Sequence, residues 1–309
     1  MTTALITHPD CLLHRPPPGH PERPERLSEA LKFLDHADFA GLLRKAAPMA
    51  SEGALMRVHD PDFVTAVLEA MPETGYVQID SDTIASPGTK EAILRAAGAV
   101  ILGVDIVMAG EAKNVFCAVR PPGHHATPRR AMGFCFFNSV AVGALHARAT
   151  HGLTNIAVVD FDVHHGNGTQ AAFTPDPHLF YASTHQSPLY PGTGNADETG
   201  IAHNVVNAPL PPGAGGPEFR RAFEREILPA LAAFQPELVI ISAGFDAHRD
   251  DPLAQLRLDE TDFAWATEAI CQVAKQSCAG RVVSSLEGGY DLSATARSAG
   301  AHVRALMAA

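Results

Sequence analysis

Short apolar runs and longer helical patterns alternate along this chain of 309 residues. Several of the runs lack alternating polar positions, as strands that are buried on both faces do. The runs predict strands at residues 4–7, 114–119, 155–162, 179–184, 237–243 and 281–287. The helical patterns predict helices at residues 24–35, 88–109, 138–151, 217–234, 259–277 and 293–307. This alternation is typical of an α/β fold with a doubly wound, mostly parallel sheet flanked by helices.

The chain is expected to fold as a single domain over residues 1–309. No repeat, linker or low-complexity tail divides it, and 46% of its residues are hydrophobic, which is enough for a substantial core. The stretch at residues 208–218 is rich in Pro and Gly, so we interpret it as a surface loop and not as a domain boundary.

Charge, cysteine content and the N-terminus narrow the classes of partner and compartment. Asp and Glu number 34 against 23 Lys and Arg, a net charge of −11, which argues against a nucleic acid or a membrane surface as the partner. Five scattered cysteines without a C-x-x-C pair indicate free thiols in a reducing compartment. The N-terminus lacks the features of a signal peptide, and the longest apolar run, residues 96–110, is interrupted by Asp105, so we expect it to be too short to span a bilayer. The sequence therefore predicts a soluble, cytoplasmic protein.

Polar, chemically active residues follow four of the predicted strands. They form the segments RPPGHHA (120–126), DFDVHHGNGT (160–169), AGFDAHRDDP (243–252) and EGGYDL (287–292). In open α/β sheets, ligands bind beyond the carboxyl ends of the strands. We therefore expect the four segments to converge in space.

Two carboxylates and one imidazole in these segments suggest a metal site. Asp162 and His164 are two residues apart and can point the same way on an extended chain, and Asp246 follows another strand. Such a set can hold a divalent ion and leave a position open for water and substrate. Taken alone, Asp162 is equally consistent with an aspartate that accepts backbone hydrogen bonds, and His164 with a core histidine. The four segments together favour the metal site.

Two further features suggest acid–base chemistry. His124 and His125 follow a rigid Pro-Pro-Gly turn and could move protons near neutral pH, although an exposed histidine pair is the simpler interpretation. Tyr290 follows Gly288 and Gly289, which permit an unusual backbone path. A tyrosine presented in this way could donate a hydrogen bond to a polarised carbonyl oxygen.

In this order, and together with GFCFFN (133–138) and HPERPERL (20–27), the segments resemble the zinc-dependent histone deacetylase family, which shares its fold with arginase. The resemblance covers nearly the whole chain. It implies that Asp162, His164 and Asp246 bind zinc. It also implies that His125 is the general base and acid, and that Tyr290 polarises the amide carbonyl together with zinc.

The resemblance assigns supporting roles as well. His124 would be the electrostatic neighbour of His125, Asp160 would support His124, and Asn167 would support His125. Class I members have an aspartate at the position of Asn167, so this chain is similar to class II. The residues implied for the substrate channel are Gly133, Phe134, Tyr190, Leu253 and His20, with Tyr190 where the family usually has Phe. The ligands implied for a monovalent cation, usually potassium, are Asp160, Ser183, and the backbone of Asp162, His164 and Thr184.

The implied substrate is an acetylated lysine or a related acylated small amine. Polyamine-selective relatives carry a glutamate just after the GFD loop and a constricting P-E-x-C-E segment near the N-terminus. This chain has Leu253 at the first place and PPGHPERPERL at the second. Both departures disfavour an acetylpolyamine amidohydrolase.

The sequence also disfavours a non-catalytic protein and an arginase-like enzyme. A non-catalytic acyl-lysine binding protein on the same fold would have lost a metal ligand or the tyrosine, and none is missing. An arginase-like hydrolase with two metal ions needs more carboxylates where His124 and His125 stand. An oligomer is compatible with the sequence.

Overall fold

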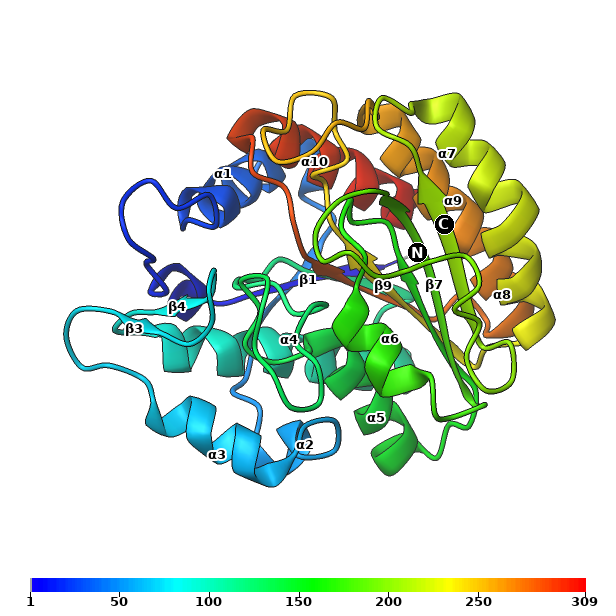
Figure 1. The fold of residues 1–309 in the computed structure, drawn as a ribbon. Coiled ribbons are helices and arrows are strands. Elements are labelled where there is room, and N and C mark those ends of the chain that lie inside the picture. The colour runs from blue at the N-terminus through cyan, green and yellow to red at the C-terminus, as the bar shows by residue number, and fades with distance from the viewer. Residues whose placement is uncertain (1) are drawn as a thin grey trace.

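The computed structural model describes residues 2–309, and its centre is one sheet of eight parallel strands with helices on both faces (Figure 1). The strand order is β2-β1-β5-β10-β9-β6-β7-β8. The bounds are β1 (Thr3–Thr7), β2 (Leu43–Ala46), β5 (Asn114–Cys117), β6 (Ile156–Asp160), β7 (Leu179–Gln186), β8 (Val205–Leu210), β9 (Leu238–Ala243) and β10 (Val282–Leu286). A separate antiparallel pair comprises β3 (Val77–Gln78) and β4 (Ile84–Ala85).

The helices form two layers, one on each face of the sheet (Figure 1). One layer contains α1 (Glu25–Leu34), α7 (Gly216–Ala222), α8 (Leu228–Phe234), α9 (Glu260–Ser277) and α10 (Leu292–Ala308). The other contains α2 (Glu52–Leu55), α3 (Pro61–Glu69), α4 (Thr89–Ala109), α5 (Ser139–His151) and α6 (Asn167–Phe173). Every residue of β5, β6, β7, β9 and β10 is buried, because both faces of these strands are covered. This explains why their sequences lack polar alternation.

The predicted strands and helices are confirmed, with two corrections. The helix expected at 217–234 is interrupted by a π-helical turn over Phe223–Ile227, in which the backbone N–H of Leu228 bonds the carbonyl of Phe223. Pro229 follows at once and has no N–H to continue the α-helical pattern, so the helix changes its pitch here. The loop expected at 208–218 begins as a strand, because β8 extends to Leu210. Pro209 is tolerated in β8 because this strand lies at the edge of the sheet.

The long apolar segment lies in α4, which matches the helix expected at residues 88–109. α4 has 21 residues, and its most apolar 18-residue window has a mean hydropathy of 2.0. By length and composition it could therefore cross a membrane, contrary to the expectation that the apolar run is too short to do so. However, 67% of its most apolar window is buried inside the protein, where α4 packs on α5, β1, β5 and β10. Its hydrophobicity is that of a core helix.

The strand order brings the four polar segments together. They follow β5, β10, β9 and β6, and these four strands are consecutive neighbours in the sheet. Because all of them are parallel, their carboxyl ends lie together at one end of the sheet, its carboxyl-terminal end. The sheet therefore positions the candidate site.

Candidate active site

Asp162, His164 and Asp246 converge at the carboxyl-terminal end of the sheet. His164 Nδ1 lies 3.1 Å from Asp162 Oδ1 and 3.1 Å from Asp246 Oδ2, and all three residues are buried. Asp162 and Asp246 follow β6 and β9 by two and three residues, so Asp162 lies beyond its strand and not within it as expected. Each carboxylate is also held by the backbone: Asp162 accepts from Gly288 N at 2.8 Å, and Asp246 accepts from Val163 N at 2.9 Å.

Two glycines make room for the carboxylates. A Cβ atom on Gly244 would collide with the carboxylate of Asp162, and one on Gly288 would collide with both Asp162 and Asp246. The backbone of the β9 and β10 loops therefore approaches the carboxylates more closely than any other residue type permits.

The charges of this group favour a cation. Burial opposes ionisation, yet the neighbouring His124 and His164 hold the pKa of Asp162 well below its usual range. Burial and the charge of Asp162 raise the pKa of Asp246. Burial opposes charge on His164, but its bonds to the two carboxylates raise its pKa to about 10. A metal ion bound between the carboxylates would replace the proton of His164, since only the neutral imidazole is a ligand.

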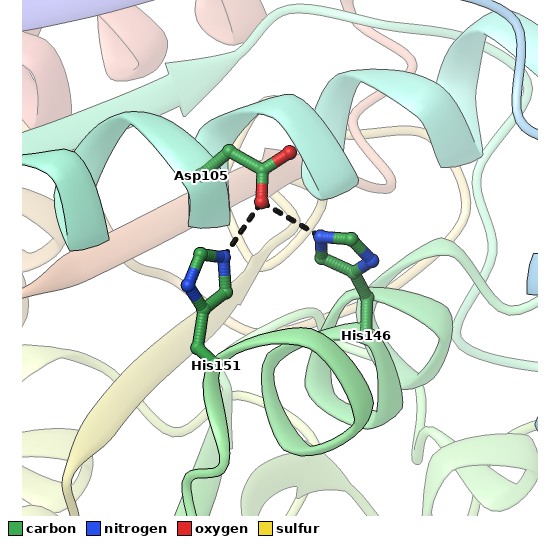
Figure 2. Close-up of side chains that lie close together, drawn as sticks. All are labelled: Asp105, His146 and His151. Atoms are coloured by element: carbon green, nitrogen blue, oxygen red, sulfur yellow. Dashed lines mark hydrogen bonds and ion pairs between the residues drawn. The ribbon is translucent and has the colours of Figure 1, made fainter.

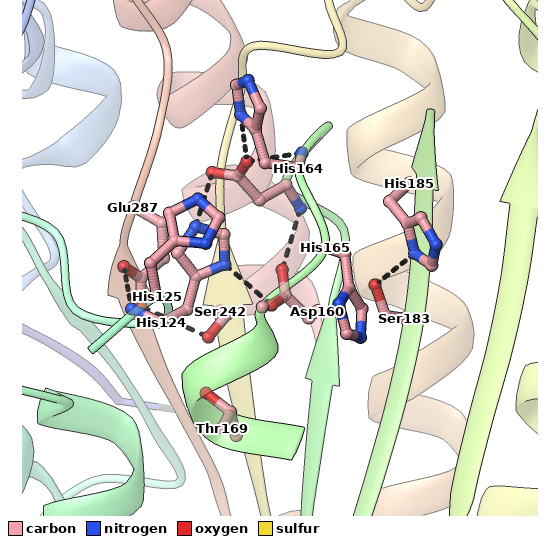
Figure 3. A network of polar contacts seen from close by, with 12 residues as sticks. His124, His125, Asp160, His164, His165, Thr169, Ser183, His185, Ser242 and Glu287 are labelled. Atoms are coloured by element: carbon pink, nitrogen blue, oxygen red, sulfur yellow. Dashed lines mark hydrogen bonds and ion pairs between the residues drawn. The ribbon is translucent and has the colours of Figure 1, made fainter. Parts of the chain in front are cut away.

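The two adjacent histidines have different partners, and Figure 3 shows the contact of His124 with Asp160. His124 Nδ1 lies 2.9 Å from Asp160 Oδ2, and His125 Nδ1 lies 2.8 Å from Asn167 Oδ1. Burial opposes charge on His124, but Asp162 and Asp160 outweigh it and raise its pKa to about 10. Burial, and then the positive charges of His124 and His164, lower the pKa of His125 well below its usual value. One ring is thus cationic and its neighbour is a neutral base, and neither histidine is exposed.

A buried glutamate holds the histidine loop from behind. Glu287 accepts backbone hydrogen bonds from Gly123 at 2.6 Å and from His124 at 3.2 Å, and the Ser242 hydroxyl donates to it at 3.2 Å. Burial raises the pKa of Glu287 to about 7, although His124 opposes this shift. Its position inside the EGGYDL segment was the only signal of this role in the sequence.

Tyr290 is held over the site by its neighbours. Its backbone N–H donates to Asp251 Oδ2 at 2.7 Å, and the guanidinium carbon of Arg26 lies 4.6 Å from the centre of its ring. Gly289 adopts φ 123°, as the sequence suggested for this turn. Burial raises the pKa of the Tyr290 hydroxyl above its usual value despite the nearby Arg26, so the hydroxyl remains protonated. Asp251 and Arg26 were not identified from the sequence.

A cavity of about 240 Å³ leads to the buried group. It is lined by Asp82, His125, Gly133, Phe134, His164, Leu189, Tyr190, Leu253 and Tyr290. Four of the five residues expected in the channel are therefore in its wall. The fifth, His20, is not: it packs against the ring of Phe134 at a centroid distance of 4.8 Å, because its imidazole is bound to the backbone of Glu22 and Asp82. Sequence reasoning also missed Asp82, which follows no long strand and belongs to no motif.

The ligands implied for a monovalent cation lie next to the group of Asp162, His164 and Asp246, on the side of β6 and β7. Asp160 and Ser183 are register partners on β6 and β7. Asp160 Oδ1 accepts from the backbone of Asp162 at 3.0 Å, and Ser183 Oγ lies 2.9 Å from His185 Nδ1. Thr184, whose backbone is the predicted ligand, follows Ser183 directly on β7. The structure brings these residues together, and the cation itself stays a prediction.

Known proteins are similar to this chain in sequence and architecture. Residues 20–306 match the histone deacetylase domain. Histone deacetylase 14 of Arabidopsis thaliana (chloroplastic) is 42% identical over 94% of this chain and 73% of the relative. The histone deacetylase-like amidohydrolase of Pseudomonas aeruginosa is 38% identical over 88% of this chain and 73% of the relative. The crystal structure of the HDA15 HD domain superposes with a TM-score of 0.94 at 37% identity, and covers 99% of this chain and 88% of that one.

Proposed function

The chain belongs to the histone deacetylase family, and from this premise we propose that it is a zinc-dependent deacylase of acetylated lysine or of a related acylated amine. The observation that carries the proposal is the convergence of three buried metal-ligating groups with a neutral histidine and a tyrosine hydroxyl at one cavity.

The residues present fit a zinc ion. Two buried carboxylates face one imidazole, and no Lys or Arg of residues 2–309 pairs with them. Gly244 and Gly288 leave the space in which the two carboxylates come close together. Asp162, His164 and Asp246 would hold the ion with one position open, as catalytic zinc requires. Zinc held there would act as a Lewis acid and increase the acidity of water.

The protein's own groups supply the proton transfers. His125 Nδ1–H donates a hydrogen bond to Asn167 Oδ1, which leaves the Nε2 lone pair to act as a base. His125 takes a proton from the attacking water and then donates it to the leaving amine, so that one residue serves both halves of the amide hydrolysis. The protonated Tyr290 hydroxyl donates a hydrogen bond to the carbonyl oxygen as negative charge develops on it. The cationic His124 stabilises the same charge at longer range.

Two further components belong to this proposal. Potassium would be held by Asp160, Ser183 and the neighbouring backbone carbonyls, where it would balance buried negative charge. A reducing compartment such as the cytoplasm suits the five cysteines, all of which are free and buried.

One observation favours a second candidate, an acetylpolyamine amidohydrolase. Asp82 places a carboxylate in the cavity wall, where it accepts from Gly133 N at 2.9 Å, and it could pair with a cationic amine. The polyamine deacetylase HDAC10 of Homo sapiens is 38% identical over 99% of this chain, which spans about half of that relative. Leu253 nevertheless lines the same cavity and is apolar, so it offers no partner for a second cationic amine. For this reason we propose acyl-lysine, and not an acetylpolyamine, as the substrate.

The deciding experiment compares acetyl-lysine peptides with acetylpolyamines as substrates for the zinc-loaded protein. Higher kcat/KM for the peptides is expected, and preference for the polyamines would select the second candidate. Binding of either substrate without hydrolysis would instead indicate an acyl-lysine binding protein. His125→Ala is the matched inactive control, because it removes the base and leaves the three metal ligands in place.

A further inference from the structure

A second group of metal-ligating side chains lies between α4 and α5 (Figure 2). Asp105 comes from α4, and His146 and His151 come from α5. Asp105 Oδ1 lies 2.7 Å from Nε2 of His146 and 2.7 Å from Nε2 of His151. Three donor atoms from two helices therefore meet at one point.

This group is separate from the candidate active site. α5 leads into β6, so His151 precedes that strand and Asp162 follows it. The five residues of β6 span roughly 16 Å at about 3.3 Å per residue. The group therefore lies at the amino-terminal end of the sheet, where it cannot contact a substrate in the cavity.

The surroundings of Asp105 favour a cation. Asp105 is the only charged residue of α4 after Arg95, in a helix that is otherwise apolar from there to Ala109. α5 ends at the group, with His151 as its last residue and Gly152 as its cap. A helix C-terminus carries partial negative charge, and here that of α5 adds to the carboxylate.

The donor atoms are also suitable as ligands. Imidazole nitrogen and carboxylate oxygen are the donors that zinc and similar divalent ions prefer. His146 Nδ1 lies 3.3 Å from Thr150 Oγ1, which can accept a hydrogen bond from Nδ1–H and leave Nε2 for a metal. Arg57 Nη1 also lies 3.3 Å from His146 Nδ1, but Arg57 is exposed and can turn away.

Access and flexibility are compatible with binding. The side chains of His146, His151 and Asp105 are 11%, 23% and 44% exposed, so solvent reaches the group and water could complete the coordination. Ligand atoms around one zinc ion are about 3.3 Å apart, so the present 2.7 Å contacts must open by about 0.6 Å. His151 is the last residue of α5, where such a movement is easy.

We propose that Asp105, His146 and His151 bind a second divalent transition-metal ion, of which zinc is the probe, and that this ion clamps α5 to α4. The site has a structural role and does not depend on the proposed deacylase activity.

The test counts zinc in purified protein that has been equilibrated with micromolar zinc and then desalted. Wild type should retain about two ions per chain, and His151→Gln about one. His36→Gln, which removes an exposed imidazole elsewhere, should retain two. Equal zinc content in wild type and His151→Gln would overturn the proposal, because the two histidines would then only share hydrogen bonds with Asp105.

A second variant separates this site from the active site. Asp246→Ala should retain about one ion, and Asp246→Ala combined with His151→Gln none. In the Asp246→Ala background, added cobalt(II) should give visible absorption bands that Asp105→Asn abolishes. Bands that persist in Asp105→Asn would show that the ion lies elsewhere and would refute the assignment.

A third readout does not need the Asp246 variant to fold. Zinc should raise the melting temperature of wild type by more than it raises that of His151→Gln, since an ion that binds only the folded state stabilises it. Turnover of the zinc-loaded enzyme should be the same in both. An identical rise in the two proteins would contradict the clamp.

Discussion

Glu22 and Arg120 form a bidentate ion pair in the interior, in which Nε and Nη2 of Arg120 each donate to one carboxylate oxygen at 2.6 Å. Arg26 donates to the same carboxylate at 2.9 Å, and both of its other donors reach backbone carbonyls of the Glu287–Gly289 turn. The HPERPERL segment thus ties the N-terminus to the loops that carry His124 and Tyr290. These mutual contacts are the physical reason why the charged side chains of Glu22, Arg26 and Arg120 can be buried.

Replacing Glu22 should be severely destabilising. Glu22→Ala would leave two buried guanidinium groups without their carboxylate, a change that typically costs about 3–5 kcal/mol. Urea unfolding followed by circular dichroism measures the loss. Glu25→Ala, three residues along the chain and exposed, is the matched control and should change the free energy of unfolding little. Similar values for the two variants would show that the ion pairs contribute no net stability.

Asp246→Ala should lower the zinc content of the protein by about one ion per chain. The remaining two ligands, Asp162 and His164, do not make an adequate site, and zinc analysis by mass spectrometry checks this directly. Asp250→Ala changes an exposed aspartate of the same loop and should keep the full content. Undiminished zinc in the Asp246 variant would mean that the ligand set is wrong.

Tyr290→Phe should keep the fold and the metal but lose most turnover. Removal of one donor to a developing oxyanion typically lowers kcat by about 100-fold or more. Steady-state kinetics on an acetyl-lysine peptide measures the effect, and Tyr76→Phe at an exposed position is the control. Activity within a few-fold of wild type would exclude Tyr290 as the hydrogen-bond donor.

Asn167→Asp should shift the pH profile to higher pH. A carboxylate in place of the amide oxygen, 2.8 Å from His125 Nδ1, would stabilise the imidazolium and raise the pKa of His125. Because only neutral His125 is a base, the acidic limb of kcat/KM should move upward by about one to two pH units. Asn155→Asp, at the far end of β6, should leave the limb in place. If the acidic limb of kcat/KM stayed at the same pH or moved to lower pH in Asn167→Asp, the role of His125 would be contradicted.

Leu253→Glu should raise kcat/KM for acetylpolyamines relative to acetyl-lysine peptides. Leu253 lines the cavity, and a carboxylate there could pair with the cationic substrate. A hydrogen bond to a charged group contributes about 1.5–3 kcal/mol, so the ratio should change by roughly tenfold or more. Ile201→Glu, at an exposed site, is the control for added charge. An unchanged ratio in a folded, zinc-loaded variant would place the selectivity elsewhere, and Asp82 would be the first residue to test.

The sequence by itself determined the fold class, the main strands and helices, and most of the site. Buried parallel strands have a distinctive unbroken apolar pattern, so β6 and β9 could be recognised from their residues alone. The ligands Asp162 and His164 are two residues apart, and their relationship is local. The family resemblance then identified their partners, including Asn167 for His125.

The sequence did not predict the short elements β8 and α6, because they lack a distinctive pattern. β8 contains a proline and lies at the edge of the sheet, and α6 is a single short helix over Asn167–Phe173. Neither has enough residues for a periodic pattern to emerge. Tertiary packing, and not local preference, decides their conformation.

Only the tertiary structure decided which residues distant in the sequence meet. The order β5-β10-β9-β6 sets the convergence of the four loops, and no local pattern encodes the order of strands. The same holds for Asp82 in the cavity wall and for Asp105 beside His146 and His151. Each of these contacts joins segments about 40 or more residues apart, and it forms because packing of whole helices and strands brings them together.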